Sequence, residues 1–137
     1  MAGNDSNERR AAESGDVGGV RYWICRNRMM GQRGPGYWTV YVDASCMTVK
    51  DGSFVTGESG VDTLLDVHGG CTYFGKAGGI FALRGECDEN LVVAGWDYMH
   101  GYDLLDPSDF LNLSSKQTLD EVRNDVRSAL ECFLRGP

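Results

Sequence analysis

Short runs of aromatic and β-branched side chains alternate with polar, glycine-rich segments through the middle of the chain, a pattern typical of strands. Residues 20–25 and 37–43 predict two strands of this kind. The segment between them, residues 26–36, carries three arginines and ends in Gly-Pro-Gly, so we expect an antiparallel hairpin across an arginine loop. That loop is either solvated and paired with acidic groups or a contact site for anions.

Further apolar runs extend the predicted sheet. Residues 71–74 predict a third strand and residues 80–83 a short one. Residues 91–97 begin with a continuous apolar run, which favours an interior strand covered on both faces. Weaker signals predict a tight turn at Lys50-Asp51-Gly52 and one or two helical turns over residues 60–66.

The clearest element is a C-terminal helix from Thr118 to Leu134. Thr118 and Glu121 have the spacing of a capping box, and Gly136 is a stop signal. Apolar residues then recur every three or four positions and form one face: Leu119, Val122, Val126, Ala129, Leu130 and Phe133. The fold class predicted is therefore α+β, an antiparallel sheet of about four to six strands with this amphipathic helix packed on one face.

The domain organisation expected is a disordered N-terminal tail, residues 1–19, followed by a single α+β domain, residues 20–137. Residues 1–19 are small and polar and end in Gly-Gly. The chain has 137 residues, which suits one domain, and no apolar run approaches the length of a membrane span. No apolar signal core occurs at the N-terminus, so a cytoplasmic location is expected.

The net charge of −7 argues against direct nucleic-acid binding and against docking on anionic membranes. The acidity is concentrated between Glu86 and Asp125, where basic residues are only Arg123 and Lys116. This segment predicts a solvated acidic face, a cation site or a surface for a basic partner.

The five cysteines are odd in number and contain no C-x-x-C pair, which disfavours a zinc ribbon and a disulfide framework. Most of them lie in apolar patterns, which predicts buried thiols.

Two motifs hold the candidate chemistry. The chain has two histidines, His68 in Val-His-Gly-Gly-Cys-Thr and His100 in Gly-Trp-Asp-Tyr-Met-His-Gly-Tyr-Asp. We predict that the fold assembles one polar pocket from four side chains of these motifs, which are His68, Asp97, His100 and Asp103. They are the candidate catalytic residues and the candidate ligands of a divalent metal such as Zn²⁺, Mn²⁺ or Fe²⁺. The candidate ligand-binding neighbours are Gly69, Gly70, Thr72 and Trp96, since glycines allow close approach of a ligand.

Three interpretations of this cluster remain open: a structural polar network, acid–base or metal-assisted catalysis, and ligand binding without chemistry. Nucleotide-binding glycine loops and the serine-hydrolase elbow are absent from the sequence.

The same two motifs resemble those of a family of small bacteriophage and mobile-element proteins. That family carries Val-His-Gly-Gly-x-Thr, then Gly-aromatic-Asp-x-x-His-x-x-Asp, then a C-terminal helix; here these are residues 67–72, residues 95–103 and the helix from Thr118. The resemblance covers residues 37–137 and implies a cytoplasmic setting and a mobile-gene origin, but no particular activity. The family's proline- and histidine-containing segment after the first aromatic strand has no counterpart in residues 42–45.

A mobile-gene origin adds a second function class. The leading expectation is a protein whose pocket binds a metal or a small ligand. The alternative is an acidic interaction protein that inhibits a host factor, with the His/Asp cluster purely structural. Partners expected are thus a small ligand or a host protein, and a homodimer is a candidate assembly.

Overall fold

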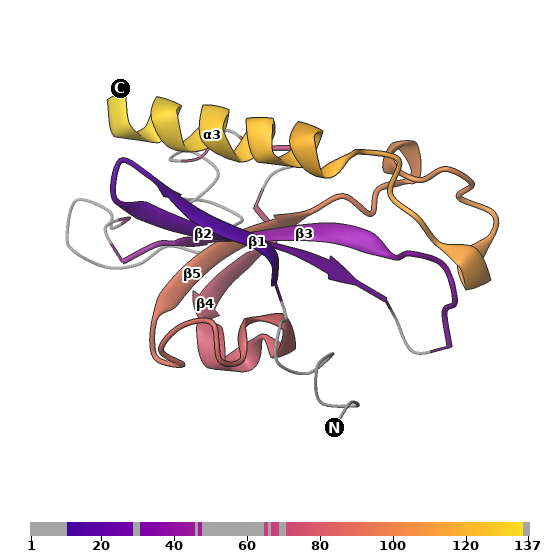
Figure 1. Ribbon diagram of the computed structural model, residues 1–137, viewed down its shortest axis with the longest axis horizontal. Coiled ribbons are helices and arrows are strands. Elements are labelled where there is room, and N and C mark those ends of the chain that lie inside the picture. The colour runs from indigo at the N-terminus through magenta and orange to yellow at the C-terminus, as the bar shows by residue number, and fades with distance from the viewer. Residues whose placement is uncertain are drawn as a thin grey trace.

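Five strands form one antiparallel sheet, and one long helix covers one of its faces (Figure 1). The computed structural model describes residues 11–28, 31–45, 47, 65, 67–68 and 71–135. The strands lie in the order β1-β2-β3-β5-β4, with bounds β1 Ala11–Val17, β2 Val20–Asn27, β3 Tyr37–Asp43, β4 Tyr73–Lys76 and β5 Val92–Asp97. The helix, α3, spans Leu119–Arg135. The α+β fold expected from the sequence is confirmed.

Strands β2 and β3 pair as the predicted hairpin, with Asn27 opposite Tyr37 at the loop end. Their side chains alternate between the two faces of the sheet, as extended backbone requires. Tyr22 and Ile24 belong to the core under α3, whereas Trp23 and Cys25 belong to a second core on the opposite face. The sheet is therefore buried on both faces, which explains why these strands are apolar almost throughout.

The two cores differ in what covers them. On the α3 face, buried side chains of the sheet meet three buried residues of the helix, Val122, Val126 and Leu130. On the other face the covering elements are two 3₁₀ helices, η2 Ala77–Gly79 and η3 Phe81–Leu83. The sequence predicts a strand over residues 80–83; this prediction is wrong, because Phe81, Ala82 and Leu83 form a helical turn that buries Ala82 and Leu83 and leaves Phe81 exposed.

Strand β5 lies between β3 and β4, so the prediction of an interior strand over residues 91–97 is confirmed. Strand β4 is an edge strand and begins at Tyr73, two residues later than expected. After β5 the chain continues through η4 Gly101–Asp103 and η5 Phe110–Asn112 before it reaches α3. Leu113 is buried and anchors this segment in the interior, whereas Leu111 is exposed.

The predicted disordered tail is too long. Residues 11–17 form β1, which pairs with β2 from Ala11 opposite Cys25 to Val17 opposite Val20, and Gly18 and Gly19 make the connecting turn with positive φ. The prediction fails because β1 is polar, with Glu13, Ser14, Gly15 and Asp16, and shows no apolar alternation. Residues 1–10 lie outside the described residues.

Helix α3 begins as its capping box predicts. The Glu121 backbone N–H donates to Thr118 Oγ1 at 3.1 Å, and the Thr118 N–H donates to Glu121 Oε1 at 2.8 Å.

Cys25 and Cys71 are buried as expected, but Cys132 on this helix is exposed. Among the helices that the structure describes, none combines the length and apolar character that crossing a bilayer requires. The predicted turn at residues 50–52, the helical turns over residues 60–66 and Cys46 are not described, apart from buried Leu65.

Candidate functional site

The candidate site forms where β5 ends and the chain turns into η4. His100 is the N-cap residue of η4, and Asp103 is its third residue. Asp103 Oδ2 accepts from the His100 backbone N–H at 3.1 Å and lies 3.0 Å from His100 Nδ1. The spacing of three between His100 and Asp103 thus folds both side chains onto one short turn.

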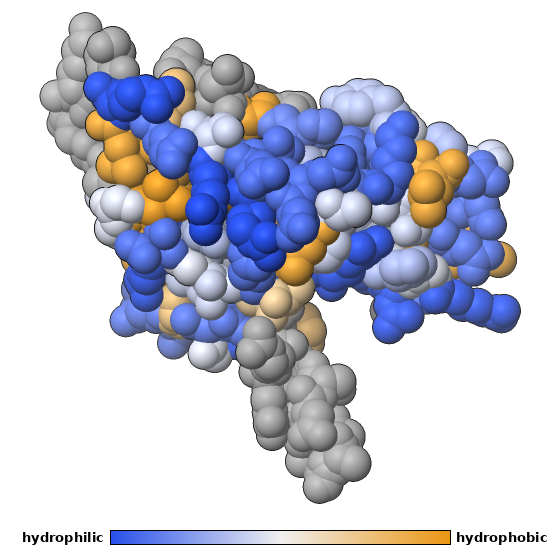
Figure 2. Space-filling model, turned by 45° about the horizontal axis from the view of Figure 1, so that its top comes forward, coloured by the Kyte–Doolittle hydropathy of each residue, from blue (hydrophilic) through white to orange (hydrophobic). Residues whose placement is uncertain are grey.

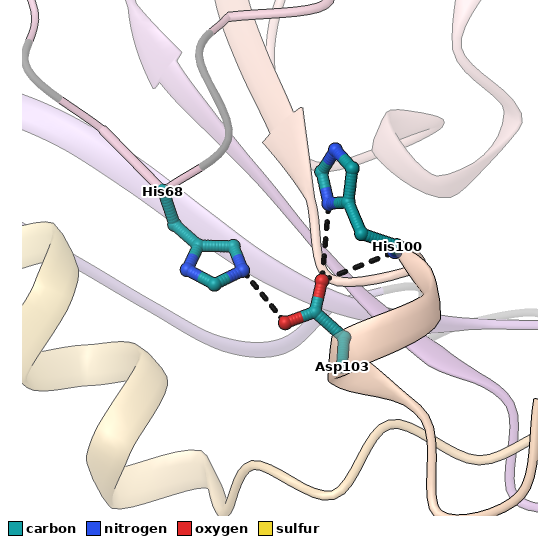
Figure 3. A group of neighbouring side chains, drawn as sticks. All are labelled: His68, His100 and Asp103. Carbon is teal, nitrogen blue, oxygen red and sulfur yellow. Dashed lines mark hydrogen bonds and ion pairs between the residues drawn. The ribbon is translucent and has the colours of Figure 1, made fainter.

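Asp103 is the centre of the site and is completely buried, with 0% of its surface exposed. Its Oδ1 lies 2.7 Å from His68 Nε2 and accepts a 2.7 Å hydrogen bond from Gln117 Nε2. With the two bonds from His100, the carboxylate has four donors drawn from three separate segments of the chain. Each carboxylate oxygen therefore binds a different imidazole (Figure 3).

These donors determine the charge of Asp103. Burial by itself raises the pKa of this carboxyl, because an ion loses hydration in the interior. The bonds from the His100 ring, Gln117, the His68 ring and the His100 backbone outweigh burial and hold the pKa below its usual range. Asp103 is thus an ionised acceptor at neutral pH.

An ionised carboxylate only accepts hydrogen bonds, so each ring nitrogen that faces Asp103 must carry the proton. His68 is therefore protonated on Nε2 and His100 on Nδ1. In the neutral rings, the free lone pairs are on His68 Nδ1 and His100 Nε2. Figure 3 shows both of these nitrogens directed away from Asp103, with His68 Nδ1 on the side of α3.

Two tyrosines fix the planes of the imidazoles. The Tyr98 ring is fully buried and stacks on His68, with centroids 4.5 Å apart and an interplanar angle of 16°. The Tyr102 ring stacks on His100 at 5.2 Å and 4°, and it is 60% exposed. Each histidine thus has an aromatic neighbour and a carboxylate partner, which together hold its orientation, while part of each ring remains open to solvent.

A second polar contact extends from Tyr98 to the helix. The Tyr98 hydroxyl donates to Asp125 Oδ2 at 2.7 Å and accepts from Trp96 Nε1 at 3.3 Å. Burial and the Asp125 carboxylate both raise the pKa of the Tyr98 phenol, so it remains a neutral donor. This hydrogen bond links Asp125 on α3 to Tyr98, whose ring stacks on His68.

The structure brings together three of the four predicted site residues, His68, His100 and Asp103, with the two imidazole centroids 5.9 Å apart. Asp97 does not join them. It follows Trp96 in β5, so its side chain lies on the opposite face of the strand, where it accepts from Thr72 Oγ1 and from the Met99 N–H.

The predicted ligand-binding neighbours separate in a similar way. Thr72 lies with Asp97 rather than with the histidines. Trp96 is only 1% exposed and supports Tyr98 from within the core instead of lining a surface. Gly69 and Gly70 lie outside the described residues.

The cluster also has the composition of a metal site. His68, His100 and Asp103 each offer one ligand atom, and these atoms lie within 4.8 Å of one another. However, the ring nitrogens nearest to Asp103, His68 Nε2 and His100 Nδ1, are the ones that must donate protons to it. A cation bound between them would have to displace both protons and break both hydrogen bonds, so the donor set fits a metal less well than it fits a carboxylate shared by two imidazoles.

Sequence reasoning missed Gln117, Tyr98 and Asp125. A glutamine directly before a helix N-cap carries no signal of a buried contact. Asp125 is one of many acidic residues between Glu86 and Asp125, and nothing in the sequence singles it out.

Arg26, near the end of β2, has a local role in the fold. The Arg26 guanidinium lies over the Trp38 ring at 4.2 Å and donates to the Gly36 carbonyl and to Ser114 Oγ at 3.2 Å. Arg26 thus ties the end of the β2–β3 hairpin to the segment before α3.

Comparisons of the chain with protein-family models, with curated proteins and with solved structures give no significant match.

Proposed function

We propose that the chain binds a small polar ligand at the His68–Asp103–His100 cluster and exchanges protons with it through the two imidazoles. The observation that carries this proposal is one fully buried carboxylate with a different, partly exposed imidazole on each oxygen. A buried carboxylate that orients a histidine and sets its tautomer is the arrangement by which proteins prepare imidazole for acid–base work.

A purely structural network would need only the hydrogen bonds to Asp103. Here each ring also presents a second nitrogen, directed away from the carboxylate, that the bonds to Asp103 leave open (Figure 3). Such a nitrogen accepts a proton when neutral and donates one when charged. The proposal accounts for this outward presentation, whereas a structural role does not require it.

Two substitutions separate the structural role from the chemical one. The amide nitrogen of glutamine stands at the position of His Nε2, and that of asparagine at the position of His Nδ1. His68→Gln and His100→Asn therefore keep a donor to Asp103 but remove the outward nitrogen. We expect the double variant to stay folded, with a thermal midpoint close to that of the wild type.

The test screens a library of small polar molecules by NMR against ¹⁵N-labelled wild type and the double variant. Expected are ligands that shift the His68 and His100 ring resonances saturably and that fail to bind the double variant. Ligands that bind elsewhere, or that bind both proteins equally, would contradict the proposal. Asp97→Asn, on the opposite face of β5, is the matched control and should leave binding unchanged.

A divalent metal is the second candidate occupant, favoured by the proximity of the three ligand atoms. Elemental analysis of purified wild type beside His100→Ala distinguishes it. A stoichiometric metal in the wild type that is lost in the variant would support the metal site and replace the acid–base proposal.

We also propose a cytoplasmic location and a mobile-element origin. The cysteines that the structure describes are all free thiols, which suits a reducing compartment. The origin is supported by the resemblance of the two histidine motifs.

A further inference from the structure

A cavity opens beside His68, on the side that faces α3. Its volume is about 300 Å³, and it is lined by Val67, His68, Asp125 and Ser128. This is the lower end of the range for small-molecule sites, roughly 300–1,000 Å³. His68 Nδ1, the nitrogen that Asp103 leaves open, lies on this side of the ring (Figure 3).

The polar groups of the cavity are held in place. Asp125 and Ser128 are three residues apart on α3, which puts both on one side of the helix. Tyr98 links Asp125 to His68, because the phenol ring stacks on the imidazole and its hydroxyl donates to the carboxylate. Asp125 and His68 are therefore spaced by one aromatic ring, and Val67 supplies an apolar wall.

The carboxylate of Asp125 has no cationic partner among the described residues. Its neighbours at helical spacing offer none either, since positions 121, 122, 128 and 129 are Glu, Val, Ser and Ala. The tyrosine hydroxyl uses one carboxylate oxygen. A negative charge that lines a cavity and pairs with no cation of the described residues is suited to a cation brought by the ligand.

We infer that this cavity binds a small organic ammonium ion that carries a hydroxyl group. The ammonium pairs with Asp125 and donates to Ser128 Oγ, and the hydroxyl donates to His68 Nδ1. This inference rests on the proposed function, because it uses the outward nitrogen of His68, and it adds the charge and chemical class of the ligand. The net charge of −7 also favours the approach of a cation.

The test uses three probes of similar size at pH 7, followed through the His68 ring and Ser128 amide resonances. Ethanolammonium carries both groups, propylammonium lacks the hydroxyl, and glycolate is an anion. We expect saturable shifts with ethanolammonium, weaker binding of propylammonium, and no saturable shift with glycolate at equal ionic strength. Glycolate binding as tight as that of ethanolammonium would overturn the inference.

Asp125→Asn keeps an oxygen for Tyr98 and should weaken ethanolammonium binding about tenfold or more. Asp120→Asn, an exposed acid on the same helix, is the control and should leave it unchanged. Should Asp125→Asn misfold, Ser128→Lys puts an ammonium beside an intact Asp125 and should block the probe. Undiminished binding in either folded variant contradicts the inference. If ligands bind at the histidines with an affinity that Asp125→Asn does not change, the inference of a cationic ligand is wrong, but the proposed function still holds.

Discussion

Asp103 is the residue on which the local structure of the site depends. Its four hydrogen bonds come from His68, His100 and Gln117, which belong to segments that precede β4, follow β5 and precede α3. A single buried charge thus holds three chain segments together. Because a buried ion is stable only with its donors in place, these contacts form as a set.

Asp103→Asn should lower the free energy of unfolding at pH 7 by about 2–4 kcal/mol, because a neutral amide accepts fewer and weaker hydrogen bonds and adds an N–H that faces other donors. Urea denaturation measures the effect. Glu131→Gln, an exposed acid on α3, is the control and should change stability little. A change at Asp103 as small as that at Glu131 would show that the four bonds contribute little.

The stabilisation by Asp103 should depend on pH in one direction. Its pKa is lower in the folded chain than the ordinary 3.8, so the folded state favours the ionised form. The contribution is therefore complete above about pH 4 and is lost as the pH falls through the lower folded pKa. The stability difference between wild type and Asp103→Asn should shrink below about pH 4. A difference that stays constant from pH 7 to pH 3 would contradict this.

At the residue scale, the sequence identified His68, His100 and Asp103 because histidines are few and the spacing of three suits one turn. It could not exclude Asp97 from the site, because the direction of this side chain depends on where β5 ends. If the strand ended one residue earlier, the Asp97 side chain could turn toward the histidines. It could not find Gln117 or Tyr98, whose roles arise only when distant segments pack together.

At the element scale, the sequence predicts those helices and strands whose signals lie within one continuous segment. Helix α3 has its capping box, its apolar stripe and its length within one continuous segment. Strand β1 has no such local signal. Its contacts are long-range: it pairs with β2, and its Glu13 meets Arg123, which is 110 residues away in sequence. The 3₁₀ turn over residues 81–83 was missed because a short apolar run suits a strand and a buried turn equally well.

Thr118→Ala tests the start of α3. Its loss leaves the Glu121 N–H without its side-chain acceptor, so we expect a loss of about 1 kcal/mol, measured by thermal or urea unfolding. Asn124→Ala, at an exposed position inside the same helix, is the control and should stabilise by up to about 0.5 kcal/mol, since alanine is the better helix former. Equal changes in unfolding free energy for the two substitutions would mean that the Thr118 cap does not stabilise the helix.

At the scale of the whole molecule, the acidic residues of segment 86–125 do not all have the same environment. Asp103 is buried among its donors, Asp125 binds Tyr98 at the cavity, and Asp120 pairs with Arg123. The surface on the side of α3 is mainly hydrophilic, with hydrophobic side chains in small separate groups (Figure 2). Charges that a composition count treats alike thus have different roles, which only their positions in the fold reveal.

The two ends of the described chain are joined by one ion pair. Arg123 on α3 donates to both carboxylate oxygens of Glu13 on β1, at 2.7 and 2.5 Å, and Tyr22 donates to the same carboxylate at 3.1 Å. The Arg123 guanidinium holds the pKa of Glu13 below its usual range, against the opposing effect of burial. Because β1 is a polar edge strand with few apolar contacts, we infer that this pair limits how often the strand opens.

Arg123→Met keeps the length of the side chain but removes the ion pair, so hydrogen exchange of the β1 amides should become faster while exchange in β5 stays unchanged. Arg127→Met, one turn further along α3, is the control: Arg127 acts on Glu13 at longer range and without a described ion pair, so its loss should change β1 exchange much less than Arg123→Met does. If β1 exchanges at the wild-type rate in Arg123→Met, pairing with β2 alone holds the strand. If β5 accelerates as well, the pair stabilises the whole sheet rather than its edge, because only a global opening exposes an interior strand together with an edge one.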